Sequence, residues 1–163
     1  MLRLAELEEL EVRVGVMGNV EGDRGLSVAE YAAVNEFGSP EAGVPERSFL
    51  RSTVDDNQRE LFVRMAVARD QAISGLSTRA IGRRLGTFLQ KAVQDRIYAG
   101  VSPPNSQITE DNKGFNHPLV ETGRLAESIS YRFGRAMGRS LKLRGFVAQT
   151  MKLTGGGPKW RWR

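Results

Sequence analysis

The side chains best suited to catalysis gather around the single histidine of the chain. His117 is the only imidazole, and Ser106, Thr109 and Glu121 are its neighbours in the sequence. A nucleophilic hydrolase needs a nucleophile, a base and an orienting group within hydrogen-bond distance. Nothing in the spacing fixes these side chains together, because His117 precedes Pro118 in a segment without helical or strand pattern. A loop histidine with an ordinary hydrogen bond is the simpler interpretation, and a hydrolase that uses His117 is kept as a rival hypothesis.

Carboxylates and glycines are the next candidates for chemistry. Asp55 and Asp56 are adjacent on a predicted helix and point to different faces, so they cannot form an acid/base pair alone. Glu110, Asp111 and Asn112 offer oxygen ligands, but Ca²⁺ takes about six to eight of them and the EF-hand spacing is missing. The chain has no cysteine, which excludes disulfides and zinc–thiolate sites, and no phosphate-binding glycine motif. We therefore expect no metal, no cofactor and no enzymatic activity.

Charge is unevenly distributed along the 163 residues, which carry 24 Lys/Arg and 19 Asp/Glu for a net charge of +5. Glu127 is the last acidic residue, and nine Lys/Arg follow it, so residues 1–127 hold 15 basic and 19 acidic side chains. A basic tail of this kind suits a polyanionic partner, namely nucleic acid, a membrane surface or an acidic protein face. The alternative is a solvated tail that only aids solubility. The candidate polyanion contacts in this tail are Arg135, Arg139, Lys142 and Arg144.

The last residues interleave aromatic and basic side chains after a triple-glycine hinge. They are Lys159, Trp160, Arg161, Trp162 and Arg163. Such a segment can stack on bases and contact phosphates, and Trp and Arg are also typical anchors at protein interfaces. Docking into a neighbouring subunit, contact with nucleic acid and no role at all are all left open.

Local patterns predict the elements that must position these residues. Valines alternate with polar residues over 11–16, which predicts a half-buried strand. Ser27 and Glu30 have the spacing of a capping box, which predicts a helix that runs to Phe37 and is ended by Gly38. The apolar stripe expected on this helix is Val28, Tyr31, Ala32, Val34 and Phe37.

Two long helical patterns follow, one from about Ser48 and one from Thr78 to about Ala99. Gly82 and Gly86 lie four residues apart on the second helix, where they either allow another helix to approach closely or are merely tolerated. The apolar face of the first helix comprises Leu50, Val54, Leu61, Met65 and Ala72; that of the second comprises Ile81, Leu85, Leu89, Ala92 and Val93.

Residues 100–121 have no regular pattern and form a long central loop. Thr122 is expected to cap a short helical turn, residues 128–133 alternate as a strand, and 141–147 suggest a further strand or a hairpin partner.

These elements predict an α+β fold. Two long helices pack on a small, mainly antiparallel β-sheet, with a long central loop and an extended basic C-terminal tail. We expect one α+β domain over 1–133 and a basic strand or tail extension over 134–163. No run approaches the roughly 18 apolar residues of a membrane-spanning helix, and the acidic N-terminus does not resemble a signal peptide, so we expect synthesis in a cytoplasm.

Short motifs, in order and separated by the two long helices, resemble the tail-completion and neck proteins of tailed bacteriophages, also described as head–tail joining or virion morphogenesis proteins. The resemblance covers residues 12–133 and does not extend beyond Gly134. The motifs are AAVNEFG at 32–38, VPERSFLR at 44–51, PPNS at 103–106, KG at 113–114, PLVETGRL at 118–125 and SI at 128–129. Within them, Pro45 and the Phe49-Leu50 pair are expected to anchor the first long helix in the core.

The resemblance implies a structural virion protein rather than an enzyme. Such proteins form a ring, typically a hexamer, between the head-side connector or adaptor and the tail terminator or tail tube, with DNA in the channel. It implies a location in the virion neck. The role of the tail over 134–163 is inferred from its charge alone: in a neck ring it could contact channel DNA without sequence preference or the acidic face of an adjacent ring. No membrane partner is expected.

Ring closure needs head-to-tail interfaces. The candidate contacts are Lys113, Gly114, Phe115, Asn116, Lys159, Trp160, Arg161, Trp162 and Arg163. The alternative is a nucleic-acid-binding protein that uses the basic tail.

Overall fold

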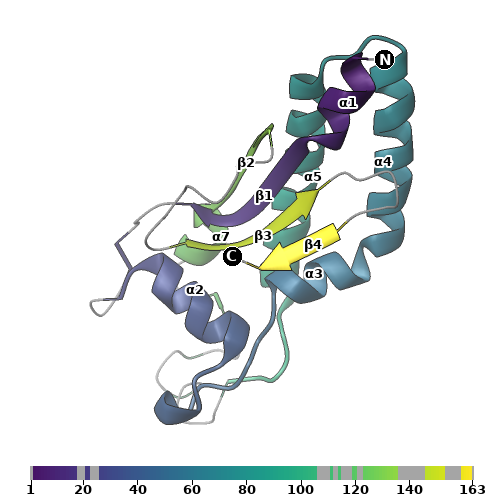
Figure 1. Cartoon of the computed structure of the whole chain (residues 1–163). Helices are drawn as coiled ribbons and strands as arrows, with labels where there is room; N and C mark the ends of the chain where they lie inside the picture. Colours follow the sequence, from purple (N-terminus) through teal and green to yellow (C-terminus); the bar gives the residue numbers. More distant parts are fainter. Residues whose placement is uncertain are drawn as a thin grey trace.

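The structure is a computed structural model that describes residues 2–17, 21–22, 26–105, 111, 114, 119–120, 123–135, 146–152 and 159–162. Helices pack on an antiparallel sheet, which confirms the predicted α+β class (Figure 1). The elements in chain order are α1 (Leu2–Glu8), β1 (Leu10–Met17), α2 (Val28–Phe37), η1 (Pro40–Ala42), α3 (Leu50–Asp56), α4 (Gln58–Ile73), α5 (Thr78–Ala99), α7 (Arg124–Ser128), β2 (Ile129–Arg135), β3 (Phe146–Lys152) and β4 (Lys159–Trp162).

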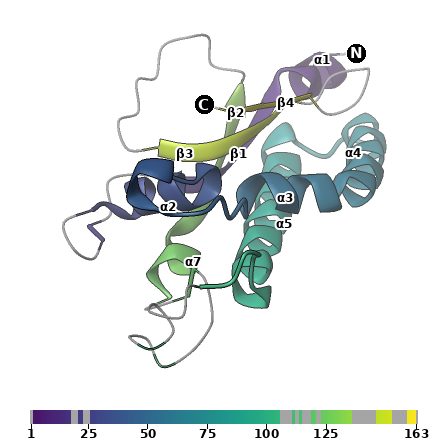
Figure 2. The same cartoon turned by 90° about the horizontal axis from the view of Figure 1, so that it is seen from below.

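The sheet has the strand order β2-β1-β3-β4, and each neighbouring pair is antiparallel. Helices α2, α3 and α5 lie on the same side of it (Figure 2). In register, Val14 of β1 lies opposite Tyr131 of β2 and Gln149 of β3. The sheet therefore combines strands from both sides of the expected 133/134 boundary.

Strand β1 is buried on both faces, so the predicted half-burial is wrong. Its valines are fully buried, and Glu11 and Gly15 on the opposite face are buried as well. The strand has a neighbour on each edge, and Glu11 satisfies its carboxylate by pairing with Arg13 at 2.8 Å. A buried charge is tolerated where it is paired in this way.

Helix α2 begins with the predicted capping box. The Glu30 amide donates to Ser27 Oγ at 3.2 Å, and the Ser27 amide donates to Glu30 Oε2 at 2.8 Å. The predicted apolar stripe is partly wrong, because Asn35 and Glu36 are buried while Phe37 is 52% exposed. The buried side of α2 is set by hydrogen bonds to the following segment rather than by the spacing of apolar residues alone.

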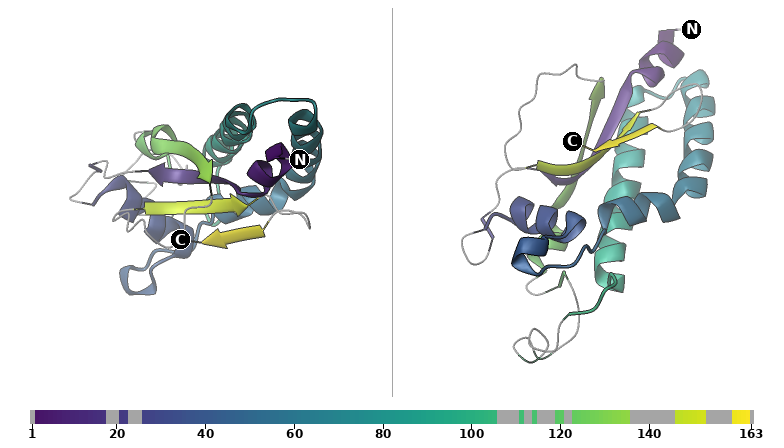
Figure 3. Two further views of the ribbon diagram at one scale, coloured as in Figure 1. Left: turned by 45° about the horizontal axis from the view of Figure 1, so that its top comes forward. Right: turned by 60° about the horizontal axis from the view of Figure 1, so that its bottom comes forward.

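The first long helical pattern is two helices, α3 and α4, which meet at Asn57 (Figure 3). The Asn57 side chain donates to the Thr53 carbonyl at 2.7 Å and helps to satisfy the end of α3. Phe49 and Leu50 are fully buried, as predicted, whereas Pro45 is exposed and its predicted place in the core is wrong. The predicted apolar face is confirmed, since its members are all buried: Leu50, Val54, Leu61, Met65 and Ala72.

Helix α5 has the predicted bounds, and its two glycines allow a close approach by the sheet rather than by another helix. A Cβ atom at Gly82 would lie 2.5 Å from Cδ2 of Phe133, and one at Gly86 would overlap the Tyr131 ring. The two aromatic rings stack on each other with centroids 6.3 Å apart. The expectation of a helix–helix contact is corrected, because strand β2 brings these rings over the glycines.

Helix α7 begins at Arg124, with Gly123 at its N-cap and no side-chain hydrogen bond there. Thr122, the predicted cap, lies outside the described residues, and the N-cap position itself is held by Gly123. Gly123 has φ 77°, a conformation that favours glycine. Ser128 ends this helix rather than starting the strand. Within the described part of the chain, no helix is both long and apolar enough to cross a lipid bilayer.

Candidate interaction surfaces

The described residues include only some of the predicted contacts. Arg135 ends β2, is exposed and pairs with Glu9 at 3.4 Å. Gly114 is exposed in the loop after α5. The segment Lys159–Trp162 forms β4, which together with β2 marks the two edges of the sheet, so the structure does not bring Arg135 next to this segment. The remaining predicted residues lie outside the described ones: Lys113, Phe115, Asn116, His117, Arg139, Lys142, Arg144 and Arg163.

The motifs of the first half of the chain meet in a buried polar cluster around Glu36, which is fully buried at the end of α2. Its carboxylate accepts hydrogen bonds from the Leu50 amide at 2.8 Å, the Arg51 amide at 3.0 Å and the Ser48 hydroxyl at 2.8 Å. Leu50 and Arg51 open α3, so a side chain of one helix caps the next. Burial raises the pKa of the Glu36 carboxyl above its ordinary value, and these hydrogen bonds oppose the rise.

Arg47 extends the cluster to the PPNS motif after α5. It is 8% exposed, and its guanidinium donates to the Pro103 carbonyl at 2.8 Å and the Pro104 carbonyl at 2.9 Å. Its backbone amide donates to the Asn35 carbonyl at 2.6 Å. Burial lowers the pKa of this guanidinium from its ordinary value. These motif side chains are occupied inside the protein, so they stabilise the fold and are not available to a partner.

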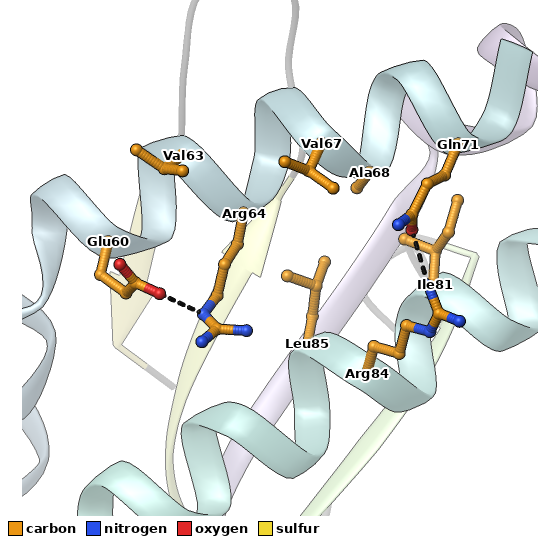
Figure 4. A pocket seen from close by; sticks show the side chains of 9 residues that line it. All are labelled: Glu60, Val63, Arg64, Val67, Ala68, Gln71, Ile81, Arg84 and Leu85. Carbon is orange, nitrogen blue, oxygen red and sulfur yellow. Dashed lines mark hydrogen bonds and ion pairs between the residues drawn. The ribbon is translucent and has the colours of Figure 1, made fainter.

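Helices α4 and α5 enclose a groove with an apolar centre, which we call the α4–α5 groove (Figure 4). It has a volume of about 340 Å³, and a wider hollow of about 820 Å³ adjoins it and shares Arg64 and Arg84. Leu85 points from α5 toward α4 between two polar contacts, Glu60–Arg64 at 2.8 Å and Arg84–Gln71 at 3.0 Å. The apolar lining comprises Val63, Val67, Ala68, Ile81 and Leu85.

The rim of this groove is basic. Arg64 lies over the Phe88 ring at 3.9 Å, and Lys91 pairs with Asp95 at 3.0 Å. Arg83 has no ion-pair partner among the residues that the structure describes. Over 58–99 the chain holds eight Lys/Arg and three Asp/Glu. The groove therefore presents apolar surface inside a net positive border.

Helix α4 also exposes large apolar side chains on its outer side. Val63 and Val67 at the groove are 50% and 46% exposed, and Phe62 and Ile73 farther around the helix are 61% and 63% exposed. Only the opposite side of α4, with Leu61 and Met65, is buried in the core. Exposed apolar groups gathered on one element mark an interaction surface.

A second surface has the opposite charge, and we call it the acidic tip. It comprises the C-terminal half of α2 and the following η1 turn up to Glu46. Residues 26–46 contain four glutamates and no Lys or Arg, but Glu30 lies in the first turn of α2, outside the tip, and Glu36 is buried. Of the two exposed glutamates of the tip, Glu46 pairs with Arg51, while Glu41 lies on η1. Phe37, half exposed, stands beside them. The acidic tip and α4 lie at opposite ends of the molecule (Figures 1 and 3).

Sequence reasoning missed both surfaces for a simple reason. Charge summed over residues 1–127 hides an acidic segment at 26–46 and a basic one at 58–99. A sliding charge count along the chain would have separated them.

The described residues hold no group of three or more His, Asp or Glu side chains placed to bind a metal ion. No family model, no curated protein and no solved structure matches this chain.

Proposed function

We propose that this chain is a structural subunit of the neck of a tailed bacteriophage. It assembles with further copies of itself into a ring, expected to be a hexamer, that joins the head-side connector to the tail. The observation that carries the proposal is the exposed apolar face of α4 beside the α4–α5 groove. Apolar side chains that remain about half exposed in the single chain favour burial in an assembly.

The buried polar cluster fits the same role. Glu36, Arg47 and their partners hold α2, α3 and the loop after α5 together by hydrogen bonds that span up to 57 residues of sequence. A ring subunit must present its surfaces at fixed angles, because repeated contacts close only when each has the same rotation. A preorganised cluster of this kind supports that requirement.

Two measurements test the proposal. Native mass spectrometry and negative-stain electron microscopy of the purified chain are expected to find a closed ring with a central channel. Quantitative mass spectrometry of purified virions is expected to count about six copies per particle, the number of a single hexameric ring. Absence of the chain from virions would overturn the proposal.

The basic C-terminal segment favours a second candidate, a protein that binds nucleic acid without sequence preference. No acidic residue follows Glu127, whereas nine Lys/Arg do. Such binding would weaken steeply with added salt as counterions are released. Deleting residues 154–163 is expected to remove retention on duplex DNA, and unchanged retention by a deletion variant with native circular dichroism would exclude this candidate.

A further inference from the structure

We propose that the α4–α5 groove of one subunit receives the acidic tip of a second copy of this chain. This contact rests on the proposed ring and deepens it by naming the two surfaces that meet. It is a head-to-tail contact, because the groove and the tip are different surfaces of the same chain.

Charge complementarity is the first argument. Glu41 and Glu46 are the exposed carboxylates of the acidic tip, and Glu46 pairs with Arg51, so Glu41 carries the negative charge that the tip offers to a partner. Residues 58–99 carry eight cations and three carboxylates. The opposite charges are exposed on the two surfaces. Glu41 is exposed on η1, and Arg83 and Arg84 line the hollow beside the groove. Opposite potentials across an interface fix its orientation and suppress wrong pairings.

Apolar surface gives the second argument. The groove has Leu85 at its floor and the half-exposed Val63 and Val67 along α4. The acidic tip offers one large apolar side chain, Phe37, at 52% exposure. An aromatic side chain that enters an apolar pocket inside a polar rim is a common energetic centre of protein interfaces.

The position of the two surfaces gives the third argument. They lie at opposite ends of the molecule, so they cannot meet within one chain, and each copy has one of each (Figure 1). A contact between unlike surfaces repeats from copy to copy and produces a closed ring or an open filament, whereas a two-fold dimer would join a surface to itself.

The acidic tip is also preformed. The amides of Ser39 and Val44 exchange hydrogen bonds with each other's carbonyls, at 2.8 Å and 2.9 Å, across the η1 turn. Gly43 closes this turn with φ 62°, and the Glu36 cluster fixes the helix behind it. A surface that is already ordered loses little conformational entropy on binding.

Charge reversal tests the contact directly, with sedimentation velocity as the measurement. Arg84→Glu and Glu41→Arg are each expected to weaken self-association by about tenfold or more, and the two together in one chain are expected to restore most of it. Arg79→Glu is the matched control, since Arg79 is an exposed cation on α5 that does not line the groove or the hollow. All the substituted side chains are exposed, so native circular dichroism is expected throughout.

Cross-linking tests the geometry, because the natural chain has no cysteine. A Glu41→Cys chain and an Arg84→Cys chain are treated with a short bis-maleimide, separately and as a mixture. A head-to-tail contact joins chains only in the mixture, and a chain with both substitutions gives a ladder of covalent oligomers. A product in either single sample would indicate a two-fold contact and overturn the inference, as would a mixture that gives no product.

The outcomes separate this inference from the proposed function. If the natural chain forms rings but both charge reversals assemble normally, the inference fails and the ring proposal stands. If the chain is absent from virions and gives no cross-link, both fail. If Arg84→Glu loses retention on duplex DNA while its self-association is unchanged, the groove binds a polyanion and the inference is overturned.

Discussion

The Glu36 carboxylate caps helix α3 from helix α2, with its Oε2 atom 2.8 Å from the backbone nitrogen of Leu50, fourteen residues along the chain. The two residues are both fully buried, so water cannot replace either partner. A helix start that is buried in this way depends on one side chain for its unsatisfied amides. The first amides of α3 therefore depend on a single carboxylate of α2 as their acceptor.

Removing this carboxylate is expected to destabilise the fold strongly. Glu36→Ala leaves the buried amide of Leu50 and the partly buried amide of Arg51 without an acceptor, which costs about 2–3 kcal/mol of unfolding free energy. Urea unfolding followed by circular dichroism measures the change. Glu41→Ala is the control, because Glu41 is exposed on η1 and its removal is expected to change stability by less than about 0.5 kcal/mol. Equal stability of the two variants would contradict the capping role.

The direction of the pKa shift of Glu36 determines how the unfolding free energy depends on pH. Burial raises the pKa of the folded carboxyl above 4.5, so the folded state binds more protons than the unfolded chain between 4.5 and the raised pKa. The unfolding free energy contributed by this group is therefore greatest below pH 4.5 and falls as pH rises through the folded pKa. Glu36→Gln removes this titrating group. The difference in unfolding free energy between the natural chain and this variant is therefore expected to shift against the natural chain as the pH rises from 4.5 through the folded pKa.

Glu30 provides the opposite sign as a control. The backbone and side-chain hydrogen bonds from Ser27 lower the pKa of its carboxyl, so its contribution is present above pH 4.5 and is lost as pH falls through the folded pKa. Urea midpoints at several pH values for Glu30→Gln and Glu36→Gln are expected to diverge from the natural chain in opposite directions. Parallel pH profiles for the two variants would contradict the assignment.

Gly86 and Gly82 are expected to resist substitution despite their low helix propensity. Alanine in place of glycine gains about 1 kcal/mol in a helix interior, but overpacking a well-filled contact costs about 1–3 kcal/mol. At Gly86 the added Cβ would meet three atoms of the Tyr131 ring, including the one bonded to its Cβ, so a simple rotation does not relieve the overlap. We expect Gly86→Ala to lower the thermal midpoint.

A double-mutant cycle checks the cause of that loss. Tyr131→Ala removes the ring, so adding Gly86→Ala to it is expected to raise stability rather than lower it. Gly134→Ala is the matched control in β2, where an added Cβ would have nothing within 4 Å. An equal loss from Gly86→Ala in both backgrounds would show that the ring contact is not responsible.

Local patterns predicted those parts of the fold that local interactions determine. The capping box at Ser27 and the apolar period of α5 act within one helix, so both could be predicted from spacing alone. The break at Asn57 could not be predicted, because no glycine or proline marks it. The buried residues on its two sides continue the same helical spacing of apolar residues. Each of these features depends on residues within a few positions of one another.

Contacts between residues far apart in the sequence could not be predicted from local patterns. Nothing near Glu36 in the sequence indicates that its carboxylate would cap a helix fourteen residues away. The α4–α5 groove exists only when two helices pack side by side, so neither apolar pattern alone predicts it. The predicted contacts in the central loop and basic tail largely fall outside the described residues, and they stay predictions.

Replacing an apolar side chain at the groove is expected to weaken self-association without unfolding the chain. Val63→Ser removes methyl groups that are half exposed in the single chain and buried in the proposed contact, so association is expected to fall several-fold while the urea midpoint changes little. Ile73→Ser is the control, since Ile73 is 63% exposed on the same helix but does not line the groove. Sedimentation velocity of the two variants measures the change in self-association. Equal weakening by both substitutions would mean that the whole exposed apolar face of α4, and not the groove, makes the contact.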